Sequence, residues 1–463
     1  MTLIKSISGI RGTIGGNPGM GLSPIDIVKF SSAFAIFLKE RLNKSNLKLV
    51  VGRDARISGP MVNNFVVSSL VSMGVDVIDL GLSTTPTVEM SVVEKKADGG
   101  IIITASHNPA QWNALKLLNE KGEFISGQEG IRLLDIANDE TLLNYATYDK
   151  LGKVEEDHQA IEKHIDAILS LPLVNVNAIR KANFKIALDA VNSTGGMAIL
   201  PLLKALGVEN VVPLYCEPTG DFPHNPEPLK ENLTEISSVV AQKKLDLGFV
   251  VDPDVDRLAI ISENGEMFGE EYTLVAVSDY VLNHTPGNTV SNMSSTRALR
   301  DITEAKGMSY FSSAVGEVNV VEKMKECSAI IGGEGNGGVI YPELHYGRDA
   351  LVGIALFLSH LATSGKKCSD LKESYPQYAI SKNKISLNEG IDVDLILKSI
   401  EKKYSNYPCS TIDGLKIELD KEWVHLRKSN TEPIIRIYSE SSSMISANDL
   451  SNKVMGEIKE LIK

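Results

Sequence analysis

The sequence predicts an α/β protein: three repeated α/β domains with mixed, mostly parallel sheets, then a smaller C-terminal α+β domain, all around a central cleft. Three observations lead to this prediction. Short apolar strands alternate with helical stretches, the same order of strands returns further along the chain, and the last segment changes to antiparallel strands. The 463 residues suffice for three or four domains, and a hydrophobic content of 43% suffices for buried cores.

The first copy of the repeat contains three strands separated by helical stretches. Leu47–Gly59 reads as a strand, a polar turn and the approach to a helix that starts near Pro60. Gly74–Leu82 is a second short strand, and a third strand runs into the motif ITASHNP at Ile103–Pro109. This alternation is typical of a parallel sheet with crossover helices. We expect this domain to cover residues 1–150.

The same order of strands returns twice. We therefore expect a second α/β domain over residues 151–257 and a third, more degenerate one over residues 258–370. The segments that match the first copy are Phe184–Gly196, Gly207–Tyr215 and Asp246–Arg257, and then Asn288–Thr296, Gly307–Gly316 and Cys327–Gly338.

The C-terminal segment has a different pattern. Ser410–Leu419 and Glu422–Glu440 are typical of antiparallel strands joined by a polar loop, and a closing helix follows from Ser446. We expect a small fourth domain over residues 371–463.

Composition and charge argue against several classes of protein. A net charge of −12 disfavours nucleic-acid binding. There is no apolar run of 18 residues and no charged-then-apolar leader, so we expect no membrane partner. The four cysteines are far apart and form no CxxC pair, which argues against zinc or a disulfide framework. We expect a cytoplasmic protein, for which a homo-oligomer is possible.

The last strand of each copy ends in a loop of unusual chemistry. Ligands of parallel α/β sheets bind beyond the carboxyl ends of the strands, so we expect the three loops to face one shared cleft. The loops carry Ser106 and His107, then Asp252, Asp254 and Asp256, and then Glu334 and Asn336.

The ITASHNP turn presents Ser106 directly after a buried strand. A serine on a rigid turn can be a nucleophile or a phosphate carrier, although an ordinary Ser-His loop explains these residues alone equally well. Lys116 could steer a phosphate, or act as a general acid or base if burial lowers its pKa, or simply be solvated. Arg11, flanked by glycines, could hold a phosphate or lie solvated on a surface turn.

The motif DPDVDR at residues 252–257 predicts a magnesium site. Three aspartates at alternate positions can converge on one hard cation, and their mutual repulsion beside a buried strand would need one. An EF-hand is excluded because its glycine and glutamate are missing, and a solvated acidic turn is the alternative. Arg257 could offset charge on a transferring phosphoryl group, pair with an aspartate, or do both.

Two further loops suit a sugar phosphate. A carboxylate and an amide among five glycines in GGEGNGGVI can bind sugar hydroxyls, and AVGE around Gly316 is a weaker signal of the same kind. The loop Arg427–Arg436 gathers hydroxyl, amide and guanidinium groups that form an anion site. A flexible loop and a solvated hairpin tip are the alternatives. The candidate anion ligands are Arg427, Ser429, Asn430, Thr431 and Arg436.

Taken in order, these loops resemble the α-D-phosphohexomutase superfamily over essentially the whole chain. The motifs are TASHNP with Asn113 and Lys116, DPDVDR, GGEGNGG and RKSNTEP, and four in this order are far more specific than one. The resemblance is greatest to the phosphoglucosamine mutase and phosphomannomutase branch. Two features depart from it: Ala114 replaces a common glycine, and Asn336 and Gly338 replace the Ser and His of a GExSGH sugar loop.

The resemblance implies an isomerase with a phosphoserine. The Ser106 phosphate passes to a sugar monophosphate, giving a 1,6-bisphosphate that returns its other phosphate to Ser106. The implied cofactors are Mg²⁺ and, as activator, hexose 1,6-bisphosphate. The implied roles are metal binding by Asp252, Asp254, Asp256 and the Ser106 phosphate, proton transfer by Lys116 and His107, phosphoryl contacts by Arg257 and Arg11, sugar contacts by Gly316, Glu334 and Asn336, and phosphate contacts by the Arg427–Arg436 loop.

We expect the substrate to be glucosamine phosphate, with the 6-phosphate and 1-phosphate interconverted. A phosphomannomutase/phosphoglucomutase of broader sugar use is the alternative in the same class. A serine hydrolase using Ser106 and His107 would lack the GxSxG elbow and leave three aspartates unexplained. A sugar-phosphate binding protein without activity is disfavoured by the presence of Ser106, Lys116 and all three aspartates.

Overall fold

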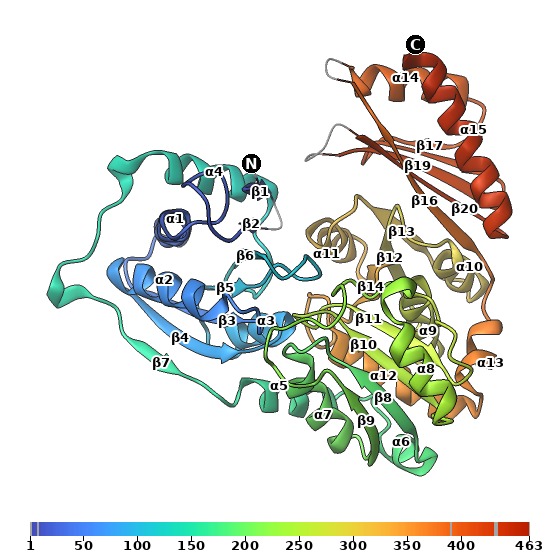
Figure 1. Cartoon of the computed structure of the whole chain (residues 1–463), viewed down its shortest axis with the longest axis horizontal. Coiled ribbons are helices and arrows are strands. Elements are labelled where there is room, and N and C mark those ends of the chain that lie inside the picture. Colours follow the sequence, from blue (N-terminus) through green and yellow to red (C-terminus); the bar gives the residue numbers. More distant parts are fainter. Residues whose placement is uncertain (1, 7–8, 389–390, 430–433, 463) are drawn as a thin grey trace.

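The computed structural model describes residues 2–6, 9–388, 391–429 and 434–462. The chain forms four sheets in sequence, each with its own helices (Figure 1). Three of the sheets are mixed and carry crossover helices, and the last is antiparallel. This confirms the predicted class of three α/β domains followed by an α+β domain. Within these ranges, no helix is long and apolar enough to cross a membrane.

The first sheet has seven strands in the order β1-β2-β6-β5-β3-β4-β7. Its last strand, β7, pairs with β4 beyond the boundary expected at residue 150. The first helix is well capped, because the Ser23 side chain accepts from the Asp26 amide and Pro24 occupies the first turn. The elements are β1 (Ile4–Ser6), β2 (Gly9–Thr13), α1 (Pro24–Leu42), β3 (Leu47–Arg53), α2 (Gly59–Ser72), β4 (Val75–Leu82), α3 (Thr85–Glu94), β5 (Gly99–Ile103), β6 (Trp112–Leu118), α4 (Gly127–Asn138) and β7 (Val154–Glu156).

The second sheet has the order β11-β10-β8-β9. The DPDVDR motif is the turn of the β10–β11 hairpin, so this sheet continues past the boundary expected at residue 257. The elements are α5 (Ala160–Leu169), α6 (Val176–Ala182), β8 (Lys185–Asp189), α7 (Gly195–Ala205), β9 (Asn210–Leu214), α8 (Thr234–Gln242), β10 (Leu247–Val251) and β11 (Leu258–Ser262).

The third sheet, β13-β12-β14-β15, repeats this plan. In each α/β domain, an antiparallel hairpin (β5–β6, β10–β11 or β14–β15) follows parallel strands, which bears out the three-fold repeat. The elements are α9 (Glu270–His284), β12 (Asn288–Asn292), α10 (Ala298–Ala305), β13 (Tyr310–Ser313), α11 (Glu317–Glu326), β14 (Ala329–Glu334), β15 (Gly338–Ile340), α12 (Ala350–Ser364) and α13 (Cys368–Glu373).

One continuous apolar core joins the second and third domains. Helix α12 lies inside it, and residues 350–361 of this helix are all buried. A helix that is apolar all round needs such a position. The polar residues just before α12 are therefore carried deep into the molecule, where they meet the functional loops.

The fourth domain is a five-stranded antiparallel sheet covered on one face by α14 and α15 (Figure 1). Its other face meets the third domain, where the Arg297 amide donates to Glu440 Oε1 (2.9 Å) and Arg300 pairs with Glu418 (2.8 Å). The closing helix begins at Met444, slightly before the expected Ser446. The elements are β16 (Ala379–Ser386), α14 (Val393–Lys403), β17 (Cys409–Ser410), β18 (Leu415–Leu419), β19 (Glu422–Lys428), β20 (Ile434–Ser441) and α15 (Met444–Ile462).

Candidate active site

The hairpin loops of the three α/β domains meet at one place. Ser106 Oγ, after β5, donates to Asp252 Oδ2, after β10, over 2.7 Å. The Leu258 amide of β11 donates to the Gly337 carbonyl in the turn before β15 (3.0 Å). The structure thus brings together the three loops that were expected to share a ligand.

Ser106 is buried and has a left-handed backbone, with φ of +48°. Its amide donates to Thr104 Oγ1 (2.9 Å), and the Thr104 hydroxyl donates to Asp54 (2.6 Å). Its own hydroxyl lies 3.3 Å from His107 Nδ1. A non-glycine residue with positive φ persists only where its surroundings hold it, so this turn is built to present the hydroxyl.

Arg56 holds the Ser106 loop from below. This arginine is fully buried and pairs with Asp54 (Nε to Oδ2, 3.0 Å). Its guanidinium also donates to four loop carbonyls, those of Ser106 (2.5 Å), Asn108 (2.7 Å), Pro109 (2.8 Å) and Trp112 (3.1 Å). The sequence analysis missed this role. The signal was the RDAR turn at the carboxyl end of β3, where ligand-side residues are expected.

The three aspartates form a compact and fully buried group. One oxygen of each of Asp252, Asp254 and Asp256 lies within 4.8 Å of the others. Thr85, at the start of α3, donates to Asp254 Oδ2 (2.6 Å) and fixes that carboxylate. In the described part of the chain, Oδ1 of Asp254 and Oδ1 of Asp256 have no hydrogen-bond donor. Buried, unpaired carboxylate oxygens fit a bound cation, so the triad could hold a metal ion.

Burial and the charges of Asp256 and Asp254 raise the pKa of Asp252 well above its usual value. Burial acts in the same direction on Asp256, but the cations Arg348, Lys116 and Arg257 outweigh it and lower the pKa of that carboxyl. The two carboxyls thus have opposite environments, one facing the Ser106 hydroxyl and one facing cations.

Lys116 on β6 lies 2.7 Å from Asp254 and 3.4 Å from Asp256. Burial lowers its pKa, but the two aspartates raise it more, so the net pKa lies above its usual value. The sequence analysis considered a general acid or base role for Lys116 if burial lowers its pKa. The neighbouring aspartates have the opposite effect on that pKa. The amine is a cation aimed at the aspartate loop.

Two of the expected cations, Arg257 and Arg11, lie near the Ser106 and aspartate loops, as does His107. Arg257 Nη1 is 3.7 Å from Glu227, and Arg11 Nη1 is 3.5 Å from Asn108 Oδ1 of the Ser106 loop. His107 Nε2 is 3.9 Å from Glu227, and burial, followed by the Arg257 charge, lowers the pKa of His107 well below its usual value. Glu227, which the sequence analysis missed, thus lies beside both residues.

Arg348 connects the aspartate loop to the glycine-rich loop. It is buried and pairs with Asp256 (2.6 Å), Glu334 (2.8 Å) and Glu317 (3.1 Å). Desolvation lowers its pKa, but the carboxylates raise it to well above the usual value. The sequence analysis missed this residue too, although an arginine directly before a wholly apolar helix was a usable signal.

The glycine-rich loop is shaped by its glycines and by Glu334. Gly337 has φ of +86°, and a Cβ added to it would lie 2.3 Å from the Leu258 carbonyl. Glu334 Oε1 accepts from the Gly316 amide (3.0 Å) and from Asn292 (2.8 Å). The structure thus joins Gly316 to Glu334. Asn336 lies at the turn with its Nδ2 3.5 Å from Glu334 Oε2.

In the fourth domain, Arg427 of β19 and Arg436 of β20 are directly opposite each other in the antiparallel register. Two like charges in such a pair repel, which favours a bound anion between them. Arg427 Nε lies 2.8 Å from Asp413 Oδ2, and the same oxygen accepts from the Val315 amide beside Gly316 (3.0 Å). The Ser429 amide donates to the Ile434 carbonyl (3.1 Å). The other two candidates, Asn430 and Thr431, lie outside the described residues.

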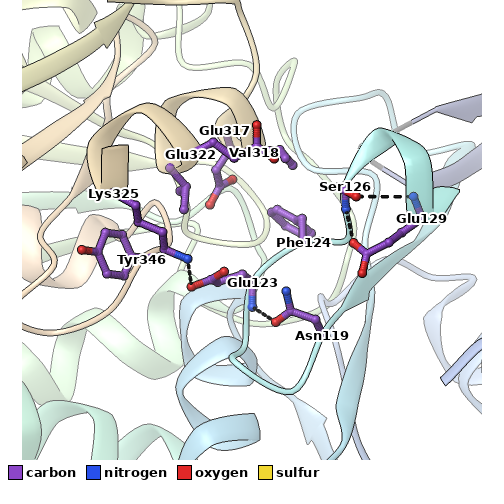
Figure 2. A pocket seen from close by; sticks show the side chains of 11 residues that line it. Asn119, Glu123, Phe124, Ser126, Glu129, Glu317, Val318, Glu322, Lys325 and Tyr346 are labelled. Carbon is purple, nitrogen blue, oxygen red and sulfur yellow. Dashed lines mark hydrogen bonds and ion pairs between the residues drawn. The ribbon is translucent and has the colours of Figure 1, made fainter. Parts of the chain in front are cut away.

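A cavity of about 200 Å³ lies next to these loops, between the first and third domains (Figure 2). Lys325 of α11 reaches across to Glu123 (2.5 Å) and covers the Tyr346 ring (4.8 Å). Phe124, on the cavity wall, lies 5.7 Å below the Lys116 ammonium. This cross-domain contact fixes the first domain against the third where the catalytic lysine candidate is placed.

Models of the phosphoglucomutase/phosphomannomutase α/β/α domains I, II and III match residues 3–143, 162–265 and 269–378, and the model of the C-terminal domain matches residues 384–456. The chain belongs to the phosphoglucomutase/phosphomannomutase family. It is a phosphohexomutase, which is an isomerase, and this confirms the resemblance and the enzyme class predicted from the motifs.

Two relatives and one solved structure are similar to this chain over nearly its full length. The chain is 35% identical to a phosphoglucomutase/phosphomannomutase of Thermococcus kodakarensis, covering 96% of both chains. It is 31% identical to a phosphoglucosamine/phosphogalactosamine mutase of Sulfurisphaera tokodaii, covering 98% of both. A family protein of Burkholderia thailandensis of known structure has a TM-score of 0.84 and 26% identity, covering 99% of this chain and 98% of that one.

Proposed function

We propose that this phosphohexomutase interconverts glucosamine 6-phosphate and glucosamine 1-phosphate through a phosphoserine at Ser106 and a 1,6-bisphosphate intermediate. The observation that carries the proposal is the 2.7 Å contact of the Ser106 hydroxyl with Asp252 inside the buried aspartate triad. The free thiols of the four cysteines support activity in the reducing cytoplasm.

The residues present fit Mg²⁺ as the cofactor. Asp252, Asp254 and Asp256 would hold the ion together with a phosphate oxygen on Ser106, and the donor-free oxygens of Asp254 and Asp256 support this. When bound, Mg²⁺ supplies positive charge to a phosphoryl group in transfer.

The remaining chemistry belongs to the chain itself. In the first half-reaction, the bond between Ser106 Oγ and phosphorus breaks while a sugar hydroxyl forms the new P–O bond and loses its proton. His107, whose Nδ1 lies 3.3 Å from Ser106 Oγ, is placed to take that proton, and the Lys116 cation to stabilise the departing serine oxygen. Arg11 and Arg257 would contact the phosphoryl oxygens.

In the second half-reaction, the bisphosphate, added as an activator or formed in place, presents its other phosphate to Ser106. A new bond forms between Ser106 Oγ and phosphorus while the bond from that phosphorus to the sugar oxygen breaks, and the sugar oxygen takes the proton held by His107. The substrate must therefore be held in two orientations by contacts that do not depend on which phosphate is distal. Arg427, Ser429, Asn430, Thr431 and Arg436 are proposed to bind the distal phosphate, and Gly316, Glu334 and Asn336 the sugar.

The choice of sugar has a specific alternative. A phosphomannomutase/phosphoglucomutase of broader use is supported by the 35% identity to the Thermococcus kodakarensis relative of that name. Phosphoglucosamine mutases, or probable ones, from several archaea are 29–31% identical and support glucosamine phosphate.

The deciding experiment is turnover of the Mg²⁺-loaded enzyme on glucosamine, glucose and mannose 1-phosphates, each primed with its 1,6-bisphosphate. We expect the highest kcat/KM on glucosamine 1-phosphate. Equal or better use of glucose or mannose 1-phosphate would establish the broader alternative. Activity on none of the three would refute both assignments.

The phosphoserine is tested separately by intact-mass measurement. We expect one added phosphate on the wild type after incubation with the bisphosphate and none on Ser106→Ala, whose turnover should be nearly abolished. Ser238→Ala keeps Ser106 and removes an exposed hydroxyl of α8, which donates to the Thr234 carbonyl, so it should still take up the phosphate. Near-normal turnover of Ser106→Ala would exclude Ser106 as the carrier.

A further inference from the structure

A second group of metal-ligand type lies outside the phosphoryl-transfer loops, at the junction of the three α/β domains. His164 on α5, His345 before α12 and Asp349 at the start of α12 place one ligand atom each within 4.8 Å of the others. His164 Nε2 is 3.0 Å and His345 Nε2 is 3.3 Å from Asp349 Oδ2. In a tetrahedral site with metal–ligand bonds of about 2.0–2.1 Å, ligand atoms lie about 3.3 Å apart, so these spacings match.

The far sides of both imidazoles face oxygen atoms from the first domain. His164 Nδ1 lies 2.9 Å from the Thr87 hydroxyl, and His345 Nδ1 lies 3.4 Å from Glu89 Oε2. Thr87 and Glu89 are both on α3. A metal-bound histidine usually donates its other ring N–H to an oxygen acceptor, most often a carboxylate or a carbonyl. Both histidines are therefore oriented with Nε2 toward the shared centre and Nδ1 toward an oxygen.

Glu89 is the independent sign that a cation belongs here. This side chain is only 2% exposed, neither of its oxygens has a hydrogen-bond donor in the described part of the chain, and its ion-pair partner is the His345 ring, whose Nδ1 lies 3.4 Å from Oε2. A buried carboxylate without a donor is costly, and Asp349 adds a second carboxylate to the same cluster. A dication at the His164–His345–Asp349 centre would compensate the negative charges of both carboxylates. It would act on Asp349 by direct contact and on Glu89 through the His345 ring.

Asp349 is well prepared to be a ligand. Its Oδ1 accepts from the Leu351 amide (2.8 Å) and the Val352 amide (3.3 Å) and so caps α12, which leaves Oδ2 facing the histidines. Because α12 lies in the core shared by the second and third domains, the carboxylate has little freedom to move.

We propose that His164, His345 and Asp349 form a binding site for a divalent transition ion of the Zn²⁺ type, with Thr87 and Glu89 orienting the two histidines. Two imidazoles and one carboxylate suit Zn²⁺, whereas Mg²⁺ prefers all-oxygen sites such as the aspartate triad. The ion links the second domain to the third, and α3 of the first domain supports it from outside. The site is structural and separate from the Ser106 centre.

The test uses the full-length protein, stripped with a chelator and then held in excess Mg²⁺ so that the aspartate triad is filled. Co²⁺ is then added as the spectroscopic probe, and Zn²⁺ is counted by elemental analysis after dialysis. We expect about one tightly held ion per chain and the intense visible absorption of tetrahedral Co²⁺ with imidazole ligands, which octahedral oxygen sites lack. Bound Zn²⁺ should also raise the Tm.

Variants locate the site. His345→Gln should lose the Co²⁺ absorption, and Glu89→Gln should weaken Zn²⁺ affinity about 10–100-fold. His158→Gln changes an exposed histidine, and its spectrum should equal that of the wild type. If His345→Gln does not fold, the wild-type titration and Glu89→Gln decide. The proposal is overturned if the wild type fails to retain Zn²⁺ in excess Mg²⁺, if the Co²⁺ spectrum is unchanged in His345→Gln, or if His158→Gln loses the Co²⁺ absorption equally. In each case His164 and His345 would only donate hydrogen bonds to Asp349.

Discussion

Replacing Arg56 by lysine should destabilise the Ser106 loop while keeping the positive charge. The guanidinium serves five acceptors: the Asp54 carboxylate and the carbonyls of Ser106, Asn108, Pro109 and Trp112. An ammonium has three donors, so at least two of these buried or part-buried acceptors lose their partner. At about 1–3 kcal/mol for each, the loop is destabilised by about 2–6 kcal/mol. Even the lower value reduces the equilibrium constant for the correctly shaped loop about 30-fold.

Steady-state turnover and thermal denaturation of Arg56→Lys measure this effect. We expect kcat to fall at least 30-fold, slower uptake of phosphate by intact mass, and a lower Tm. Arg132→Lys is the matched control, because Arg132 makes the same kind of contact with Glu40 at an exposed position and should stay near wild type. A kcat within about threefold of wild type (less than 1 kcal/mol), together with an unchanged Tm, would refute the claim that Arg56 holds the loop.

Three further predictions concern Gly337, His425 and Arg348. Gly337→Ala should lower Tm and kcat because the new Cβ meets the Leu258 carbonyl, whereas Gly365→Ala, also at positive φ but in open space, should cost less; equal losses would contradict this. Burial lowers the pKa of His425 to about 4, so the unfolded state binds more protons than the folded state between pH 4 and about 6.5. The free energy of unfolding should therefore rise with pH across that range, by up to about 3 kcal/mol. Denaturant titrations of His425→Gln should show a flatter dependence of this free energy on pH, and an unchanged dependence would contradict the prediction. Arg348→Lys should lower turnover about 100-fold and shift the Mg²⁺ activation curve, because one ammonium cannot reach three carboxylates, and an unshifted curve would count against this reasoning.

Strand order and the chemistry of strand ends were predictable from the sequence. Parallel strands of a repeated unit place their carboxyl ends on one side, so Ser106, the aspartate triad and Glu334 were expected to share a site. The structure brings these residues together. The DPDVDR spacing also predicted a cation site, and the donor-free oxygens of Asp254 and Asp256 agree with it.

The supporting residues were not predictable in the same way. The positions of Arg56, at a strand end, and of Arg348, directly before an apolar helix, gave a signal that each lies near the site, but an isolated arginine is usually exposed and the local sequence does not show which other loops supply its partners. Thr85 reaches the aspartate loop from another domain. The domain boundaries were expected at residues 150 and 257, whereas β7 and β11 complete the first and second sheets beyond them. β7 pairs with β4 in parallel and β11 pairs with β10 across a hairpin, and this backbone pairing was the missing information.

The left-handed backbone of Ser106 bears on which hydroxyl residue suits this position. With φ of +48°, a β-branched side chain at this position would be strained, although the chain bears that strain at Val191 (φ +47°) and Val255 (φ +64°). Threonine keeps a hydroxyl of nearly the same acidity, but its extra methyl group would add strain to the turn that aims that hydroxyl at Asp252. The torsion angle thus favours serine over threonine at the position proposed to carry the phosphate.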